Sequence, residues 1–155
     1  MEPKQVTELG LDICHQLMES ENTHQAIKLN NIVSIDGRYR LGPANATQMA
    51  CAGDYGCMTP EVYWGEGYDK RLDIYALGLV MYTLLNDGCP PLAEPGFDEV
   101  QLHKACLRRL EGEAFPPPKN GSSALQQIVM KACAYEPKDR YANAEQLAQA
   151  LREVL

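Results

Sequence analysis

The sequence predicts a mainly helical domain that contains one small β-hairpin. The first observation is an apolar run over residues 72–85, which leaves no polar face and is typical of a buried core helix. Its length of about 14 residues is too short to cross a bilayer, which takes roughly 20. The second is Asp36-Gly37 between two β-prone tetrapeptides, a strong signal for a two-residue hairpin because both turn positions favour positive φ. The third is apolar spacing of three to four residues in the flanking segments, which favours further helices.

The first half of the chain divides into three predicted segments. Pro3 can open a helix, and apolar residues follow it at helical spacing, which predicts a helix over residues 4–19. The hairpin is expected over residues 32–41. Residues 42–57 are rich in small side chains and show no periodicity, so they are predicted to form a loop.

The second half predicts three helices after the apolar run. Apolar spacing indicates a helix over residues 98–111, and Pro116-Pro117-Pro118 follows it as a rigid connector, with a docking ligand for a proline-binding domain as the alternative. Ser122 or Ser123 is expected to cap the next helix. Asn143 is expected to cap the last helix, with Gln146 as its capping-box partner.

Composition excludes several classes of function. The 155 residues suffice for one domain, and no internal repeat divides them. A net charge of −7, from 14 basic and 21 acidic residues, argues against a nucleic-acid partner or an anionic membrane surface. The chain shows neither a signal peptide nor an apolar span, so a cytoplasmic location is expected.

The six cysteines are expected to be reduced thiols. None forms a C-x-x-C motif and no histidine pair has zinc-ligand spacing, so neither a metal nor another cofactor is expected. Cys51 and Cys57 lie in the predicted loop, where redox activity is the alternative.

Three motifs, in order, resemble the protein kinase family. Thr59-Pro60-Glu61 is similar to the A-P-E motif that ends a kinase activation segment. The segment from Asp73 to Gly78 is similar to the D-x-W-S-x-G start of the family's central helix. Residues 136–141, E-P-K-D-R-Y, are similar to the P-x-x-R segment before the last helix. The resemblance covers residues 6–155 and implies a bacterial serine/threonine kinase-like C-lobe, mainly helical with one small hairpin.

The resemblance also locates a catalytic loop, in which the chemistry is altered. A kinase reads H-R-D-x-x-x-x-N here, and its aspartate takes the proton of the substrate hydroxyl. The matching octapeptide keeps His24, Lys28 and Asn31 but holds Gln25 and Ala26 at the arginine and aspartate positions. A methyl group cannot accept a proton, so the sequence predicts no catalytic residue. Lys28 and Asn31 are expected to be solvated or to brace the loop, with residual ligand binding as the alternative.

Two further kinase features are expected to be absent. Pro43 stands where the metal-binding aspartate of D-F-G belongs, and magnesium requires hard anionic oxygens. Only 23 residues precede His24, and they contain neither a Gly-rich loop nor a V-A-I-K lysine. The expectation is therefore a single C-lobe-like domain over residues 1–155, without the N-lobe.

The resemblance implies structural roles for the remaining motif residues. Glu61 is expected to pair with Arg140, and Asp73 to accept hydrogen bonds from catalytic-loop amides near His24. His24 itself is expected to be a structural residue of that loop. Gly78 belongs to the same set of structural positions.

Trp64 and Tyr68 follow the A-P-E-like motif and are expected to pack over the central helix. Participation in a partner surface is the alternative for these two aromatic residues.

Three functions agree with these features. The favoured one is a non-catalytic pseudokinase C-lobe that acts as a protein-binding or scaffold module. The second is the C-terminal half of a kinase whose N-lobe another chain supplies. The third is a folded remnant with no selected role.

A partner surface is expected where a kinase N-lobe would lie. Val33 matches the floor of the family's adenine pocket, and Leu41 and Tyr39 lie on the partner strand. Self-association through the hairpin at 32–41 and the helix at 4–19 is therefore expected, because soluble proteins seldom expose large apolar patches. The alternative is that the following loop folds back and leaves a monomer. The loop at 90–96 and the helix after it form the family's docking region for substrates and regulators.

Overall fold

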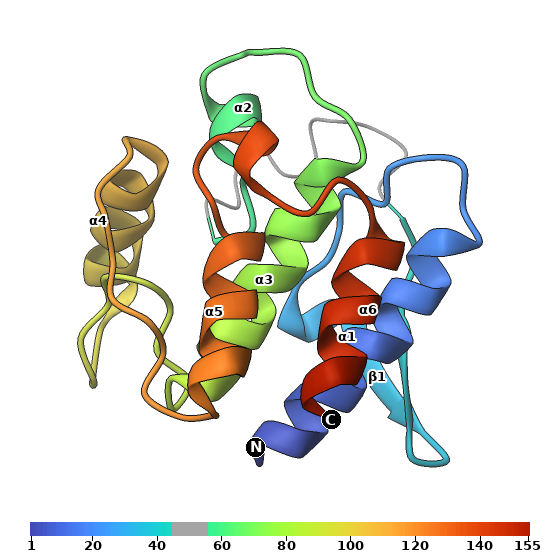
Figure 1. Ribbon diagram of the computed structural model, residues 1–155. Helices are drawn as coiled ribbons and strands as arrows, with labels where there is room; N and C mark the ends of the chain where they lie inside the picture. The colour runs from blue at the N-terminus through green and yellow to red at the C-terminus, as the bar shows by residue number, and fades with distance from the viewer. Residues whose placement is uncertain (45–55) are drawn as a thin grey trace.

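A computed structural model describes residues 1–44 and 56–155 of the chain, so Cys51 and most of the predicted loop at 42–57 lie outside the described residues. The fold is mainly helical with a two-stranded antiparallel sheet, as predicted (Figure 1). The elements in order are α1 (Pro3–Met18), a 3-10 turn (Leu29–Asn31), β1 (Ile32–Ile35), β2 (Arg38–Leu41), α2 (Pro60–Tyr63), α3 (Arg71–Leu85), α4 (Glu99–Leu110), α5 (Ser123–Ala132), a second 3-10 turn (Pro137–Asp139) and α6 (Ala144–Val154).

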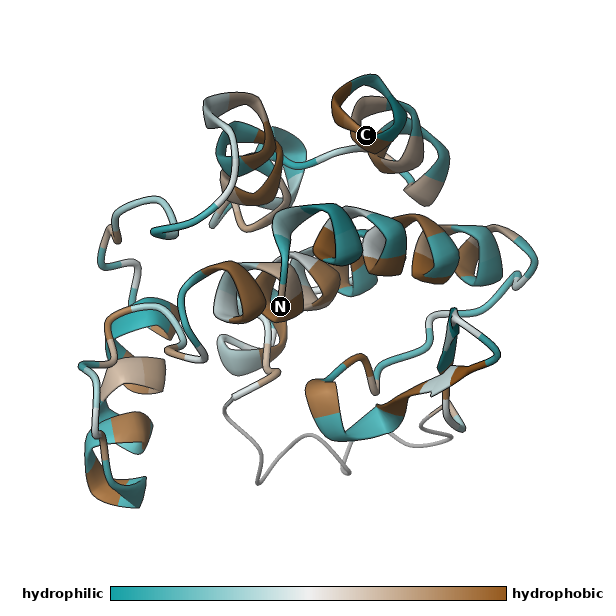
Figure 2. Cartoon of the chain, turned by 90° about the horizontal axis from the view of Figure 1, so that it is seen from below, coloured by the Kyte–Doolittle hydropathy of each residue, from teal (hydrophilic) through white to brown (hydrophobic). Residues whose placement is uncertain are grey.

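Helix α3 forms the centre of the packing. Figure 1 shows it running through the middle of the molecule, with α5 and α6 across one side, α1 and the hairpin on another, and α4 at the periphery. Twelve of its residues are buried, and they lie on all sides of the helix. The prediction of a core helix without a polar face is confirmed. Seen from below and coloured by hydropathy, the hairpin carries apolar and hydrophilic residues together (Figure 2).

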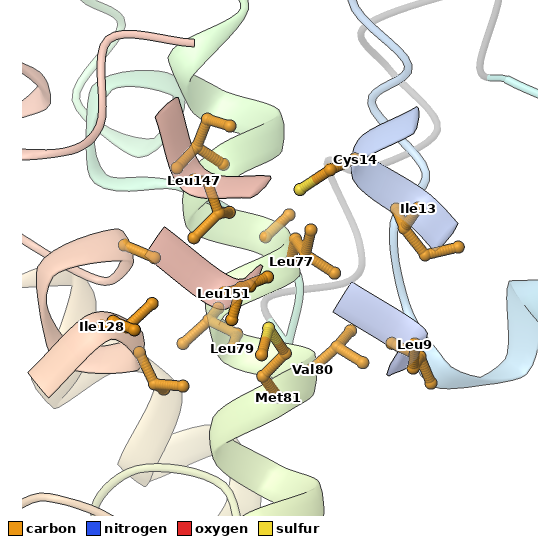
Figure 3. Close-up of a cluster of buried hydrophobic side chains, with 14 of the residues drawn as sticks. Leu9, Ile13, Cys14, Leu77, Leu79, Val80, Met81, Ile128, Leu147 and Leu151 are labelled. Atoms are coloured by element: carbon orange, nitrogen blue, oxygen red, sulfur yellow. The ribbon is translucent and has the colours of Figure 1, made fainter. Parts of the chain in front are cut away.

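The core is built from helices that lie far apart in the sequence. Side chains from α1, α3, α5 and α6 meet in one cluster (Figure 3). The members that the figure labels are Leu9, Ile13, Cys14, Leu77, Leu79, Val80, Met81, Ile128, Leu147 and Leu151. Gly78 permits the contact between α3 and α5, because an added Cβ would lie 2.8 Å from the Cys133 sulfur and 2.9 Å from Ala132 Cβ. A side chain at this position would push the two helices apart.

The hairpin forms with the predicted strands and turn. Asp36 and Gly37 both have positive φ, 51° and 76°, as a two-residue turn of this kind requires. The register pairs Ile32 with Leu41 and Ile35 with Arg38.

Helix α1 closes the outer edge of β2 with two polar side chains. The Tyr39 N–H donates to Asp12 Oδ2 at 2.9 Å, and the Leu41 N–H donates to Gln16 Oε1 at 3.0 Å. Gln16 Nε2 donates in turn to the Tyr39 carbonyl at 2.9 Å. Asp12 also pairs with Arg38 at 2.6 Å. Asp12 and Gln16 are spaced i, i+4, so they share one face of α1 and are the sequence signal for this contact.

The helix caps follow the sequence with one difference. Ser122 rather than Ser123 caps α5, since its Oγ accepts from the Leu125 N–H at 3.2 Å. Asn143 caps α6 by accepting from the Gln146 N–H at 2.9 Å. The predicted capping box is completed differently, because the Gln146 side chain accepts from the Ala142 N–H at 3.1 Å rather than from Asn143.

The proline-rich connector is attached to α3. The Tyr82 hydroxyl donates to the Pro116 carbonyl at 2.9 Å, and the Phe115 ring meets the Tyr82 ring edge-on. Within the described ranges, no helix combines the length and the apolar character that a membrane crossing demands.

The five cysteines among the described residues are free thiols. Burial raises the pKa of Cys14 and of Cys133 to about 12, so neither is a thiolate at neutral pH.

Candidate functional site

The candidate site is the loop between α1 and β1, and Asp73 fixes the middle of this loop. Asp73 lies in the first turn of α3 and is 2% exposed. Its carboxylate accepts the His24 N–H at 2.7 Å and the Gln25 N–H at 3.0 Å. Gln25 has a φ of 61°, which few non-glycine residues adopt, and this pair of hydrogen bonds holds the backbone there.

Burial dominates the ionisation of Asp73. It raises the pKa of the carboxyl above its ordinary value of 3.8, because the charged form loses water. The two backbone N–H groups act in the opposite direction but more weakly.

His24 connects this loop to the residues after β2. Its Nε2 lies 2.9 Å from the Gly42 carbonyl, and its Nδ1 lies 3.2 Å from the Ala26 nitrogen. A carbonyl can only accept and a backbone N–H can only donate, so the ring carries its proton on Nε2. Both ring nitrogens are engaged in hydrogen bonds within the loop and to the residue after β2, and a structural role for His24 stays a prediction.

Asn31 brings Ala26 and Pro43 together. Its amide Nδ2 donates to the Ala26 carbonyl at 2.9 Å and to the Pro43 carbonyl at 3.2 Å. These two acceptors orient the NH₂ group toward them, and Gly42 leaves room for the amide oxygen, which an added Cβ would strike. We call this arrangement of Ala26, Asn31 and Pro43 the amide clamp.

The amide clamp contains no acid, base or anionic ligand. Ala26 contributes a methyl group and Pro43 a ring without an N–H. Lys28 is half-buried and its carbonyl accepts the Asn31 N–H at 2.9 Å. In the part of the chain that the structure describes, no group of three or more histidine, cysteine, aspartate or glutamate residues is placed to hold a metal ion.

A second constellation joins the segment after residue 58 to the last helices. Arg140 donates to Glu61 through Nη1 at 2.8 Å and through Nη2 at 3.3 Å, and the two side chains are 0% and 3% exposed. The ion pair expected between these residues is therefore present and buried. Three carbonyls accept the remaining Arg140 bonds, those of Ala134 at 2.7 Å, Tyr135 at 3.0 Å and Arg71 at 3.2 Å.

Tyr75 lies between two guanidinium groups. Arg140 Cζ is 4.6 Å and Arg109 Cζ is 5.5 Å from the centre of the Tyr75 ring, within the range of cation–π attraction. Arg109 also donates to the Tyr75 hydroxyl at 2.8 Å and to the Met58 carbonyl at 2.9 Å. Burial raises the pKa of Tyr75 to about 12, so the hydroxyl is protonated at neutral pH. We call Glu61, Tyr75, Arg109 and Arg140 the arginine anchor.

Sequence reasoning missed Arg109. This residue lies on α4 next to Arg108 and is only 3% exposed. Its spacing could have predicted this burial. Cys106, three residues before Arg109, and Leu110, the next residue, lie on the buried face of α4.

Trp64 contradicts its expected position. It is 55% exposed, and its Nε1 donates to the Leu110 carbonyl at 3.1 Å and the Tyr135 hydroxyl at 2.7 Å. It therefore lies against the end of α4 instead of over the central helix. The last turn of a helix has carbonyls without an intrahelical partner, and the indole N–H donates to one of them. Tyr68 is half-buried.

The fold and these two constellations define a kinase-like unit, and comparisons with known proteins agree. The family model for the protein kinase domain matches residues 4–151, so the chain belongs to the protein kinase family. It is 37% identical over 103 residues to serine/threonine-protein kinase Pkn1 of Myxococcus xanthus, which covers 63% of this chain and 14% of that protein.

The chain also covers only a small part of the length of other relatives. Aurora kinase of Saccharomyces cerevisiae is 27% identical over 131 residues, which is 83% of this chain and 33% of the kinase. Tyrosine-protein kinase MasK of Myxococcus xanthus is 36% identical over 106 residues, which is 66% of this chain and 16% of that protein. The chain thus spans between about a seventh and a third of the length of these three relatives.

Proposed function

We propose that the chain is a pseudokinase C-lobe, which keeps the kinase scaffold, transfers no phosphate and acts by binding protein. The observation that carries the proposal is the amide clamp. The two positions at which a kinase needs carboxylates hold Ala26 and Pro43, and Asn31 uses its amide N–H groups to hold their carbonyls.

The residues of this chain do not fit ATP with magnesium. In phosphoryl transfer a carboxylate accepts the proton of the attacking hydroxyl, and metal ions neutralise charge on the phosphates. Neither Ala26 nor Pro43 has a side-chain atom for either task. Magnesium prefers anionic oxygens in octahedral geometry, and Asn31 contributes one neutral amide oxygen at most. No catalytic step is therefore assigned to these residues.

Two features together support a protein-binding role: buried polar contacts that hold the scaffold, and apolar side chains that are exposed on its surface. The arginine anchor and Asp73 keep the helices and the loop in defined positions. The surface around them exposes large apolar side chains, including Val33 and Ile35 at 50% each and Trp64 at 55%. Exposed aromatic and aliphatic residues on a rigid frame are typical of interaction surfaces.

The relatives named above are kinases, and this supports a second proposal, that the chain takes part in an active kinase. This chain would then be one half of an enzyme that another chain completes. Ala26 and Pro43 weigh against that proposal, because added nucleotide-binding residues would replace neither carboxylate.

Transfer of the γ-phosphate tests the proposal directly. The chain would be incubated with magnesium and γ-labelled ATP, alone and with a serine- and threonine-rich substrate protein, beside an active kinase as control. We expect no label in the chain or the substrate. Ala26→Asp should also remain inactive, because Pro43 still lacks the metal-binding carboxylate. Magnesium-dependent labelling that increases with time would overturn the proposal.

A further inference from the structure

The two edges of the hairpin differ in their backbone hydrogen bonds. On β2, Tyr39 and Leu41 turn their backbone groups outward to the side chains of Asp12 and Gln16. Along an antiparallel ladder, alternate residues face the partner strand and the outer edge. The register places Ser34 opposite Tyr39, so the Ser34 N–H and C=O face away from β2. No described residue accepts or donates a hydrogen bond there, and Ser34 is exposed.

The outward side chains on β1 are apolar. Val33 and Ile35 lie on the face opposite α1 and are each 50% exposed. Arg40 and Arg38 stand opposite them on β2. An open strand edge beside exposed aliphatic side chains favours pairing with another strand.

We propose that the β1 edge pairs with β1 of a second copy of this chain, antiparallel and centred on Ser34. This inference names a partner for the proposed protein-binding function and in that respect rests on it. In this register the Ser34 residues of the two copies exchange both backbone hydrogen bonds, as a hydrogen-bonded pair does in an antiparallel sheet. The result is a four-stranded sheet in which the two β1 strands are central and the two β2 strands lie outside.

The register is self-complementary in its side chains. Centring on Ser34 places Val33 of one copy opposite Ile35 of the other, twice, so four aliphatic side chains form one continuous row. Aliphatic cross-strand pairs of this kind stabilise antiparallel sheets. Stacking the two hairpins face to face would instead bring Arg38 and Arg40 of both copies together.

Charge also favours edge pairing. The arginines lie on the outer strands, so three strand spacings, roughly 14 Å, separate those of one copy from those of the other. This separation exceeds the Debye length of about 8 Å at physiological salt. Repulsion between the copies is therefore weak.

Helix α1 determines which edge is open. Its residues Asp12 and Gln16 occupy the β2 edge, which leaves the β1 edge for pairing. The helix itself does not contact the second copy. A four-residue strand buries little area, and interfaces below about 1,200 Å² are usually transient. We therefore expect a weak, concentration-dependent dimer.

Sedimentation equilibrium between about 5 and 500 µM tests the inference. The wild type should form dimers across this range. Ser34→Pro removes the outward N–H while leaving the bonds to β2, and Val33→Lys places a charge in the aliphatic row. Each should weaken dimerisation at least tenfold. Val100→Lys, on an α4 residue that is 62% exposed, is the matched control and should leave the dissociation constant unchanged.

Amide hydrogen exchange followed by NMR gives an independent reading. The Ser34 N–H should exchange rapidly in dilute solution and slow down as dimer forms, whereas the Tyr39 N–H should be protected throughout. A strict monomer at all concentrations would overturn the inference, and so would a dimer indifferent to Ser34→Pro and Val33→Lys. Both results would leave the phosphate-transfer test of the proposed function untouched.

Discussion

The arginine anchor and the amide clamp both lie at positions that match kinase motifs, yet they differ in what they leave for a ligand. In the anchor, charged side chains are buried, and Glu61 and Arg140 neutralise each other at 2.8 Å. In the clamp, Ala26 and Pro43 have no carboxylate, and the Asn31 amide donates to their two backbone carbonyls. Under the proposed function, the contacts that hold this kinase-like fold together are separate from the groups that would perform kinase chemistry.

The largest effect is expected in the anchor. Arg140→Ala leaves the Glu61 carboxylate buried without its partner, which costs roughly 3–5 kcal/mol of unfolding free energy. Arg152→Ala is the matched control, because Arg152 is an exposed residue of α6 and its Nη2 lies 3.1 Å from the half-buried His15 ring. Denaturant midpoints of the two variants should differ clearly. Equal midpoints would show that the ion pair contributes little to the fold.

Asp73 connects the two regions and should have the next largest effect. Asp73→Asn places an NH₂ group against a backbone N–H of His24 or Gln25, so stability should fall by about 1–3 kcal/mol. The measurement is the urea midpoint of both proteins as a function of pH.

The pH dependence of this loss has a defined sign. The pKa of Asp73 is raised in the folded state, so its contribution is largest below pH 3.8 and decreases as pH rises through the folded pKa. The difference in unfolding free energy between the wild type and Asp73→Asn should therefore increase as the pH falls. Asp69 is the control, because its hydrogen bond with Arg71 lowers its pKa. The difference in unfolding free energy between the wild type and Asp69→Asn should decrease as the pH falls. The same pH trend for both variants would contradict the opposite pKa shifts of Asp73 and Asp69.

The sequence predicted those parts of the fold that local chemistry determines. Asp36-Gly37 forms its turn because of backbone preference, and residues 72–85 form a core helix because no polar face competes. Contacts between distant segments were harder to predict. Arg109 is buried because Met58 and Tyr75, far away in sequence, supply acceptors. Trp64 lies at the end of α4 because the Leu110 carbonyl there accepts its indole N–H.

The candidate site shows the same division. Residue identity alone indicated that Ala26 and Pro43 lack carboxylates. That Asn31 joins the two positions depends on the approach of the segment after β2, which Gly42 permits by having no side chain. Spacing along the chain does not contain this information.

A smaller effect is expected from changing the amide clamp itself. Asn31→Asp turns carboxylate oxygens toward the carbonyls of Ala26 and Pro43, so stability should fall by about 1–2 kcal/mol. Asn30→Asp changes charge equally on an exposed neighbour and should have little effect. Thermal unfolding with and without millimolar magnesium measures both variants. Recovery of Asn31→Asp by magnesium would indicate a metal site where none is expected.

The most direct test of the central claim is thermal unfolding of the wild type during titration with ATP and magnesium. A ligand at 100 times its dissociation constant adds about 2.7 kcal/mol of stability, which for a chain of this size raises Tm by roughly 5–11 °C. Because the amide clamp offers no carboxylate, we expect no saturable change up to millimolar ATP. A saturable, magnesium-dependent rise in Tm would contradict the account and favour a kinase half that awaits its complement.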